Sequence, residues 1–277
     1  MDFKIIVDSV CDITPHLLER LGVTKIPLTL RLGRKEYTDD ENLDLEGFMA
    51  EMSQSAEKAG TAAPSPHSFK NAIESAARSF VVTVSSQLSG AYSAARLGKE
   101  YAEANGVTDV HVFDSKTASA GQLLIAVKIR ELISKKIPMD QIIQTVNGFI
   151  DSMKTYLVLE RYDNLIKNGR LNKITGRLIN ILGVKLVLGA DGEGNISMHG
   201  ITRGKTQMLE KFVSLIKASG RPTSGENVVI SHCNNLPLAS QLKGLIAQRF
   251  DFKEIFVVPT GGVSSLYADN RGIIMAF

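Results

Sequence analysis

The clearest indication of the fold class is the segment Phe80-Val81-Val82-Thr83-Val84-Ser85-Ser86-Gln87-Leu88-Ser89-Gly90. Its first five residues are apolar and mostly β-branched, which is typical of a buried strand. Small and polar residues follow, and Ala91-Tyr92-Ser93-Ala94-Ala95 then begins a helical pattern. A strand that leads through a short polar loop into a helix is the repeating unit of α/β folds. We therefore predict an α/β protein.

A second loop of the same kind lies upstream, at Thr61-Ala62-Ala63-Pro64-Ser65-Pro66. Its prolines favour an extended backbone, and a helical pattern follows. The start of a helix has unpaired N–H donors and the positive end of the helix dipole, so it favours an anion. Thr61 and Ser89, with Gly90 beside Ser89, are thus candidates to bind one small anionic group. The alternative is that Ser89 only caps its helix and Thr61 only stabilises a turn.

Strands and helices alternate through the first half of the chain, which predicts a parallel or mixed sheet flanked by helices. Three polar pairs fall where predicted strands end: Asp8-Ser9, Ser85-Ser86 and Asp114-Ser115. Ligands of such sheets bind beyond the carboxyl ends of the strands. This edge of the sheet is therefore the expected place for a site.

A new strand at Thr155–Glu160 follows a helix that we expect to end near Ser152. We place a domain boundary here and predict an N-terminal α/β domain, residues 1–154, and a C-terminal α/β domain, residues 155–277, with the ligand between them. Within the second domain, Ala190–Asn195 resembles half a calcium loop. It lacks the final bidentate acid, so we predict a hairpin turn instead.

The composition is that of an ordinary globular protein, with 277 residues, 44% hydrophobic, 22% charged and a net charge of +3. This charge gives no indication of nucleic-acid binding. No apolar stretch reaches the ~18 residues of a membrane span, and no signal-peptide pattern is seen. Cys11 and Cys233 are far apart, which argues against a cysteine zinc site and suits a reducing compartment. We expect a cytoplasmic protein without stable membrane insertion.

The sequence has no Gly-x-Ser-x-Gly, no Gly-x-x-x-x-Gly-Lys and no Gly-x-Gly-x-x-Gly at a strand-to-helix turn. We therefore predict no ATP or dinucleotide site, no catalytic residues and no cofactor. Asp8, Ser9 and Asp12 suggest a metal site, but loop hydrogen bonds explain them better, so no metal is predicted. A small acyl hydrolase or transferase remains an alternative, with Ser89 as nucleophile and His67 as its base.

Five motifs occur in order along the chain: Asp8-Ser9-Val10-Cys11-Asp12, Thr61-x-x-Pro64-Ser65-Pro66, Ser85-Ser86-x-Leu88-Ser89-Gly90, Val112-Phe113-Asp114-Ser115 and Asn168-Gly169-Arg170-Leu171. Together they resemble the DegV family, acyl-binding subunits that present fatty acids to a separate fatty-acid kinase. The resemblance implies that a long-chain fatty acid is the ligand, with its carboxylate bound by Thr61 and Ser89 and with Arg170 nearby. It also implies that the kinase partner supplies the phosphoryl group and the metal. Asn168-Gly169 is typical of a helix C-terminus, so the alternative for Arg170 is that it only pairs with carbonyl groups at that helix end or lies in solvent.

Hydroxyl donors bind a carboxylate weakly, so the acyl chain has to supply most of the affinity. About fifteen methylenes at ~0.8 kcal/mol each give about 12 kcal/mol before entropy costs. We therefore expect an apolar tunnel near Ser89. Ala91, Ala94 and Ala95 would leave room for it, and Ile174, Leu178, Ile181 and Leu182 would form a wall. The alternative is that these residues only form ordinary helix cores.

The C-terminal segment departs from the family pattern. Members carry an Ala-His-x-Gly-Pro-Gly-like stretch before the last strand, whereas residues 264–272 here read SSLYADNRG. We expect Tyr267 to replace the histidine as a polar contact. The departure also leaves open a sensor or scaffold in which the lipid only adds stability.

Overall fold

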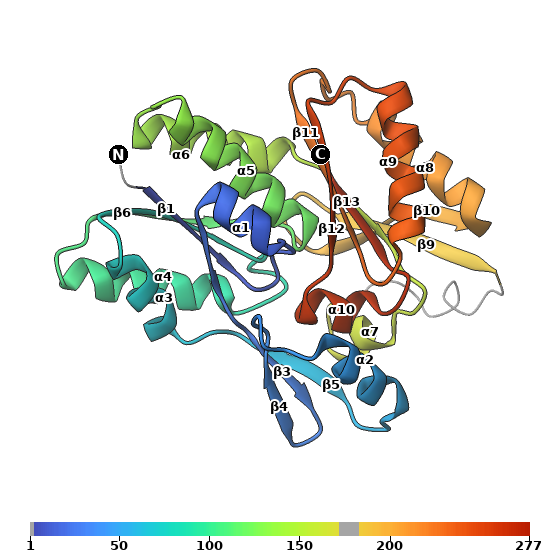
Figure 1. Cartoon of the computed structure of the whole chain (residues 1–277), viewed down its shortest axis with the longest axis horizontal. Helices are drawn as coiled ribbons and strands as arrows, with labels where there is room; N and C mark the ends of the chain where they lie inside the picture. The colour runs from blue at the N-terminus through green and yellow to red at the C-terminus, as the bar shows by residue number, and fades with distance from the viewer. Residues whose placement is uncertain (1–2, 172–182) are drawn as a thin grey trace.

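The computed structural model describes residues 3–171 and 183–277. In this part the chain forms three sheets with helices packed against them (Figure 1). The predicted α/β class is confirmed. The predicted tunnel wall, Ile174, Leu178, Ile181 and Leu182, lies outside the described residues.

The first sheet is fully parallel, as the apolar strand patterns predict. Its strands, in order across the sheet, are β2 (Val23–Ile26), β1 (Phe3–Asp8), β6 (Arg78–Thr83) and β7 (Asp109–Asp114). One face packs on α3 (Pro66–Glu74) and α4 (Ala91–Ala104), and the other on α1 (Pro15–Leu21), α5 (Ala120–Ser134) and α6 (Met139–Ser152) (Figure 1). Side chains alternate along the strands, so Ile6 and Val81 face α3 and α4, whereas Val7 and Val82 face α5.

A small antiparallel sheet lies beside the first. Its strands are β4 (Lys35–Thr38), β3 (Thr29–Leu32) and β5 (Ala59–Ala62), and α2 (Leu45–Gln54) connects β4 to β5. Thr61 therefore lies in a strand, opposite Leu30, and not in the loop that the sequence pattern predicted. Pairing with β3 supplies the backbone partners that a free loop would lack, which is why the strand extends up to residue 62.

The third sheet has six strands and is mixed. Their order is β10 (Ile196–Arg203), β9 (Val184–Ala190), β8 (Thr155–Val158), β13 (Ile273–Ala276), β11 (Asn227–His232) and β12 (Glu254–Pro259). Within this sheet, only the β11–β12 pair is parallel among the described strands. The helices of this half are α7 (Asp163–Lys167), α8 (Gly204–Ala218), α9 (Leu236–Arg249) and α10 (Gly262–Ala268).

Helix α5 lies between the parallel sheet and the six-stranded sheet, and it contacts β1 and β6 of one and β11 and β13 of the other. Residues all around it are buried, among them Leu123, Ile125 and Val127. A helix that is apolar on every side needs cover on every side, and two sheets supply it. One continuous hydrophobic cluster consequently includes residues of both sheets. The boundary between residues 154 and 155 stays a prediction.

A tight turn joins β9 and β10 into a hairpin, as predicted for Ala190–Asn195. The Asp191 carboxylate accepts hydrogen bonds from the backbone N–H of Glu193 at 2.9 Å and of Asn195 at 3.0 Å. Within residues 3–171 and 183–277, no helix has the length and hydrophobicity needed to cross a bilayer.

Candidate ligand-binding site

A pocket lies between the parallel sheet and the six-stranded sheet. Its wall is mainly aliphatic, and the aliphatic residues come from both halves of the chain: Val10, Leu28, Val84, Leu88, Leu157, Leu159, Leu165, Ile196, Val263 and Ile274. The pocket thus has the position that the sequence predicted for a ligand, and a lining suited to a hydrocarbon.

Four of the five predicted site residues line this pocket: Thr61, Ser89, Arg170 and Tyr267. The Thr61 and Tyr267 hydroxyl oxygens are 3.1 Å apart. The Arg170 guanidinium lies 6.0 Å from the centre of the Tyr267 ring, and its Nε donates to the Leu88 carbonyl at 3.1 Å. Residues from four separate segments therefore meet at one end of the pocket, which we call the polar end.

The turn after α7 brings Arg170 to the polar end. The helix ends at Asn168, and Gly169 has a φ of 73°, a left-handed conformation that glycine adopts without strain. The predicted helix end at Asn168-Gly169 is confirmed. The Asn168 side chain also donates to the Ala59 carbonyl at 2.9 Å, which ties this turn to β5 and so to Thr61. No pattern in the sequence indicated this second role.

Buried carboxylates hold the start of α10, which carries Tyr267. Asp12 accepts from the backbone N–H of Gly261 at 2.8 Å, and Asp39 accepts from Gly262 at 2.8 Å and Val263 at 3.2 Å. Negative charge is favourable at a helix N-terminus. Burial raises the pKa of Asp12 to about 6, and it also raises the pKa of Asp39. Sequence reasoning missed Asp39, because no local pattern links it to a helix more than 200 residues away.

The Asp8, Ser9 and Asp12 cluster forms loop hydrogen bonds, as predicted. Asp8 accepts from the Val84 backbone at 2.7 Å and from Gln122 at 3.0 Å, and the Ser9 hydroxyl accepts from Leu28 N–H at 3.0 Å. Burial raises the pKa of Asp8 to about 6. The described ranges contain no group of three or more His, Cys, Asp or Glu residues placed to hold a metal ion.

Ser89 lines the pocket and also pairs with the first N–H group of α4, but it precedes the N-cap residue, so the capping alternative holds only for this one hydrogen bond. Its Oγ accepts from the Ala91 N–H at 3.2 Å. Gly90 is the N-cap residue but is exposed and is not part of the pocket lining, so its contact with a ligand stays a prediction.

Ala91, Ala94 and Ala95 were expected to border the tunnel, and this was wrong. None of them lines the pocket; they belong to hydrophobic clusters around α4 instead. Strand β8 and the residue that follows it form the wall, through Thr155, Leu157 and Leu159. These alternate positions share one face of the strand, a period-two pattern that could have been found in the sequence.

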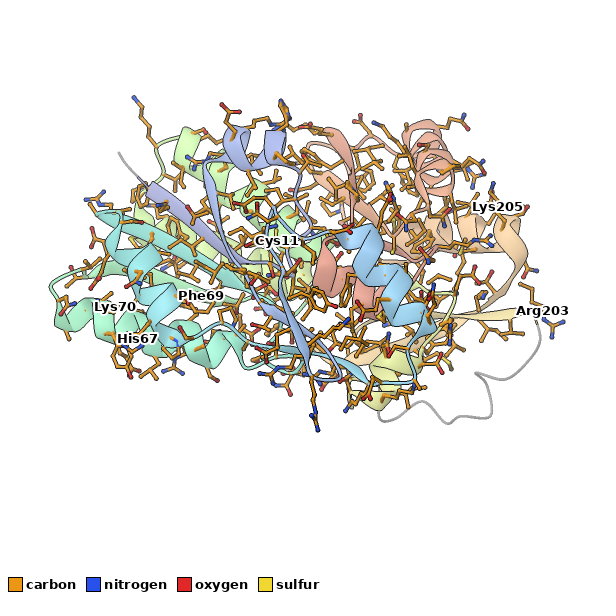
Figure 2. The ribbon with its side chains drawn as sticks, turned by 60° about the horizontal axis from the view of Figure 1, so that its bottom comes forward. Cys11, His67, Phe69, Lys70, Arg203 and Lys205 are labelled. Atoms are coloured by element: carbon orange, nitrogen blue, oxygen red, sulfur yellow. The ribbon has the colours of Figure 1, made fainter. Side chains whose placement is uncertain are left out.

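His67 lies far from the polar end. Its ring packs against Tyr101, with the ring centres 5.4 Å apart, and Figure 2 shows it on the outer part of α3 beside Lys70. Tyr101 lies ten residues beyond the start of α4 at Ala91, roughly 15 Å along the helix axis. His67 also does not line the pocket. It is therefore not placed to act as a base for Ser89.

Comparison with known proteins gives consistent matches over the whole chain. The family model described as "Uncharacterised protein, DegV family" matches residues 2–275. A DegV domain-containing protein from Streptococcus gordonii is 31% identical over 281 residues, which cover 100% of this chain and 99% of that relative.

Solved structures agree with this match. A DegV family protein from Ruminococcus gnavus, refined with vaccenic acid, has 32% identity and a TM-score of 0.94, with 99% of each chain covered. The Streptococcus pneumoniae Fatty Acid Kinase (Fak) B3 protein, loaded with linoleic acid, has 29% identity and a TM-score of 0.92, covering 100% of this chain and 99% of that chain. On these matches, and on the motifs that meet at the pocket, the chain belongs to the DegV family.

Proposed function

We propose that this protein binds a long-chain fatty acid in the pocket between its two larger sheets and presents the carboxylate at the polar end. The observation that carries the proposal is the division of the pocket. Thr61, Ser89, Arg170 and Tyr267 lie together, while most of the remaining wall is aliphatic. The fatty acids held by the two related structures support this assignment.

The arrangement suits a carboxylate that has to react later. The hydrogen bonds of Arg170 within the described residues go to the carbonyl oxygens of Leu88 and Asn168, which fix the guanidinium beside the polar end. Neutral hydroxyls orient the carboxylate without withdrawing much charge from its oxygens, in contrast to a bidentate arginine pair. We propose that a separate kinase transfers a phosphoryl group to this carboxylate in the cytoplasm.

Mass spectrometry tests lipid binding directly. Native spectra of the purified chain are expected to show an added mass equal to a long-chain fatty acid, and an organic extract is expected to contain that acid. Spectra that show only the unliganded mass, with no acid in the extract and no uptake of added palmitic acid, would contradict the proposal.

Ester substrates test the alternative. An acyl hydrolase would need a base beside Ser89, and the His67 position gives no support for one. We expect the isolated chain to leave p-nitrophenyl esters intact. Turnover that is abolished by Ser89→Ala would establish the hydrolase instead.

A further inference from the structure

A second pair of hydroxyl groups lies in the pocket, away from the polar end. The Thr117 and Thr155 Oγ1 atoms are 2.8 Å apart. Both residues line the pocket, and both are buried, at 4% and 7% exposure. Hydroxyl groups are unexpected in a wall that otherwise suits a hydrocarbon, because an unpaired buried hydroxyl is unfavourable.

Strand β8 gives a length scale for the separation between this pair and the polar end. Thr155 begins the strand, and Leu159 follows its last residue, on the side where the chain continues into α7 and Arg170. At ~3.3 Å per residue, the Cα atoms of Thr155 and Leu159 are roughly 13 Å apart. An extended acyl chain rises by about 1.25 Å per methylene for C–C bonds of ~1.52 Å, so this length corresponds to about ten methylenes.

Hydrogen-bond counting satisfies both hydroxyl hydrogens in only one of the two arrangements, and there only through a long bond. Each hydroxyl has one hydrogen and two lone pairs, and the bond between the two groups uses one hydrogen only. If Thr117 donates, the Thr155 hydrogen has no acceptor among residues 3–171 and 183–277; if Thr155 donates, the Thr117 hydrogen has only the Ala118 carbonyl at 3.4 Å. A plain hydrocarbon chain would leave this hydrogen without a good partner, whereas an oxygen atom on the chain would accept it.

Charge distinguishes the two ends of the pocket. Lys116, next to the threonine pair, is neutralised by Asp151, with Nζ 2.9 Å from its Oδ1. Arg170 has no carboxylate partner in the described part of the chain. The anionic carboxylate therefore belongs at the Arg170 end, and the threonine pair suits a neutral oxygen.

We propose that Thr117 and Thr155 make the pocket selective for long-chain fatty acids with a neutral oxygen, a hydroxyl or keto group, about ten carbons from the carboxylate. This inference rests on the proposed function, because it assumes that the carboxylate lies at the polar end.

Competition between two acids tests the selectivity. The full chain, freed of lipid on a hydrophobic resin, is titrated with stearic acid and with 10-hydroxystearic acid and analysed by native mass spectrometry. We expect the hydroxy acid to bind about five- to tenfold more tightly, the contribution of one net hydrogen bond. With 3-hydroxystearic acid, which has the same polarity but carries its oxygen near the head group, we expect no such gain.

Substitution of both threonines locates the effect. Thr117→Val with Thr155→Val removes both hydroxyls and preserves their shape, so stearic acid is expected to bind at least as tightly while the preference for 10-hydroxystearic acid is lost. Thr202→Val is the matched control, because Thr202 is buried in β10 but does not line the pocket.

The outcomes separate the two proposals. A wild-type protein that binds stearic acid as tightly as 10-hydroxystearic acid, or a double variant that keeps the preference, would overturn the role of the threonine pair and leave fatty-acid binding intact. Binding of none of these acids would contradict the proposed function itself, and the selectivity with it.

Discussion

At the polar end of the pocket, single hydroxyl groups decide how a carboxylate is held. The Thr61 and Tyr267 hydroxyls share one hydrogen bond of 3.1 Å, which uses one of their two hydrogens. The second hydrogen is available to a carboxylate oxygen. Ser89 accepts from the Ala91 N–H through a lone pair, so its own hydrogen is also available. Two hydroxyl hydrogens at one end of an apolar pocket are enough to orient a carboxylate.

Thr61→Ala and Ser89→Ala are therefore expected to weaken fatty-acid binding by about 1–3 kcal/mol each, since each removes a hydrogen bond to a charged group. Calorimetry with palmitic acid measures the loss, and thermal melts verify that the fold is intact. Ser93→Ala, at an exposed serine of α4, is the matched control. If the wild type binds palmitic acid and its methyl ester equally, the head group is not recognised here.

Arg170→Ala is expected to reduce acyl-phosphate formation more than it reduces lipid binding. Its positive charge counts most when a second anionic group, the transferred phosphoryl, arrives at the carboxylate. The rate is measured with a fatty-acid kinase subunit and ATP–magnesium, and the affinity by calorimetry. Arg161→Ala, at an exposed arginine paired with Asp163, is the control. Equal losses in rate and affinity would show that Arg170 acts only in binding.

At the scale of elements, the β9–β10 hairpin spans from the six-stranded sheet to the parallel sheet. The Ser85 hydroxyl donates to the Gly194 carbonyl at 2.8 Å, and Gly194 lines the pocket. A Cβ at Gly194 would collide with Ser85 Oγ and lie 3.0 Å from Lys116 Cα. The hairpin thus closes one side of the pocket through a contact that requires glycine.

Gly194→Ala is expected to lift this hairpin, to lower the melting temperature and to speed the release of bound lipid. Gly192→Ala is a close control, because Gly192 and Gly194 have φ values of 91° and 95° and only the Gly194 position is crowded. Both variants carry the backbone strain, of roughly 1–3 kcal/mol. Stopped-flow displacement compares the release rates, and equal rates in the two variants would mean that the docked turn does not retain the lipid.

At the scale of the whole molecule, Asp12 joins elements that are far apart in the sequence. It accepts hydrogen bonds from Ser119 at the start of α5 and from Gly261 at the start of α10. Asp8, four residues before Asp12, is also buried. Burial outweighs these hydrogen bonds and raises the pKa of Asp12 to about 6.

This shift gives the stability a defined pH dependence. The unfolded state has a pKa of ~3.9, so between pH 4 and pH 6 the folded state binds more protons at Asp12. The contribution of Asp12 to the free energy of unfolding is therefore greatest below pH 4 and falls as the pH rises through 6. We expect the wild-type value minus the Asp12→Asn value to fall by about 2 kcal/mol from pH 4 to pH 7.

Urea unfolding at a series of pH values measures this difference, and Asp140→Asn, at an exposed aspartate of α6, is the matched control. A difference that rises with pH would mean that the hydrogen bonds to Asp12 outweigh its burial.

Local patterns in the sequence predicted the local structure. The alternation of strands and helices predicted a parallel or mixed sheet, and residue types predicted the Asn168-Gly169 helix end and the turn at Ala190–Asn195, because these depend on burial and backbone preferences within a few residues. The motifs indicated the family and named Thr61, Ser89 and Arg170, and the departure from the family pattern named Tyr267; the structure brings all four to one pocket.

Which faces of the strands and helices pack together became clear only from the tertiary structure. Thr61 proved to be in a strand because β3, a segment about 30 residues away, supplies its hydrogen-bond partners. Strand β8, not the alanines of α4, forms the pocket wall. Asp39 accepts a hydrogen bond from the start of α10, which lies more than 200 residues later in the chain. These contacts depend on how the two sheets pack around α5. They join residues that are far apart in the sequence, so no local pattern predicts them.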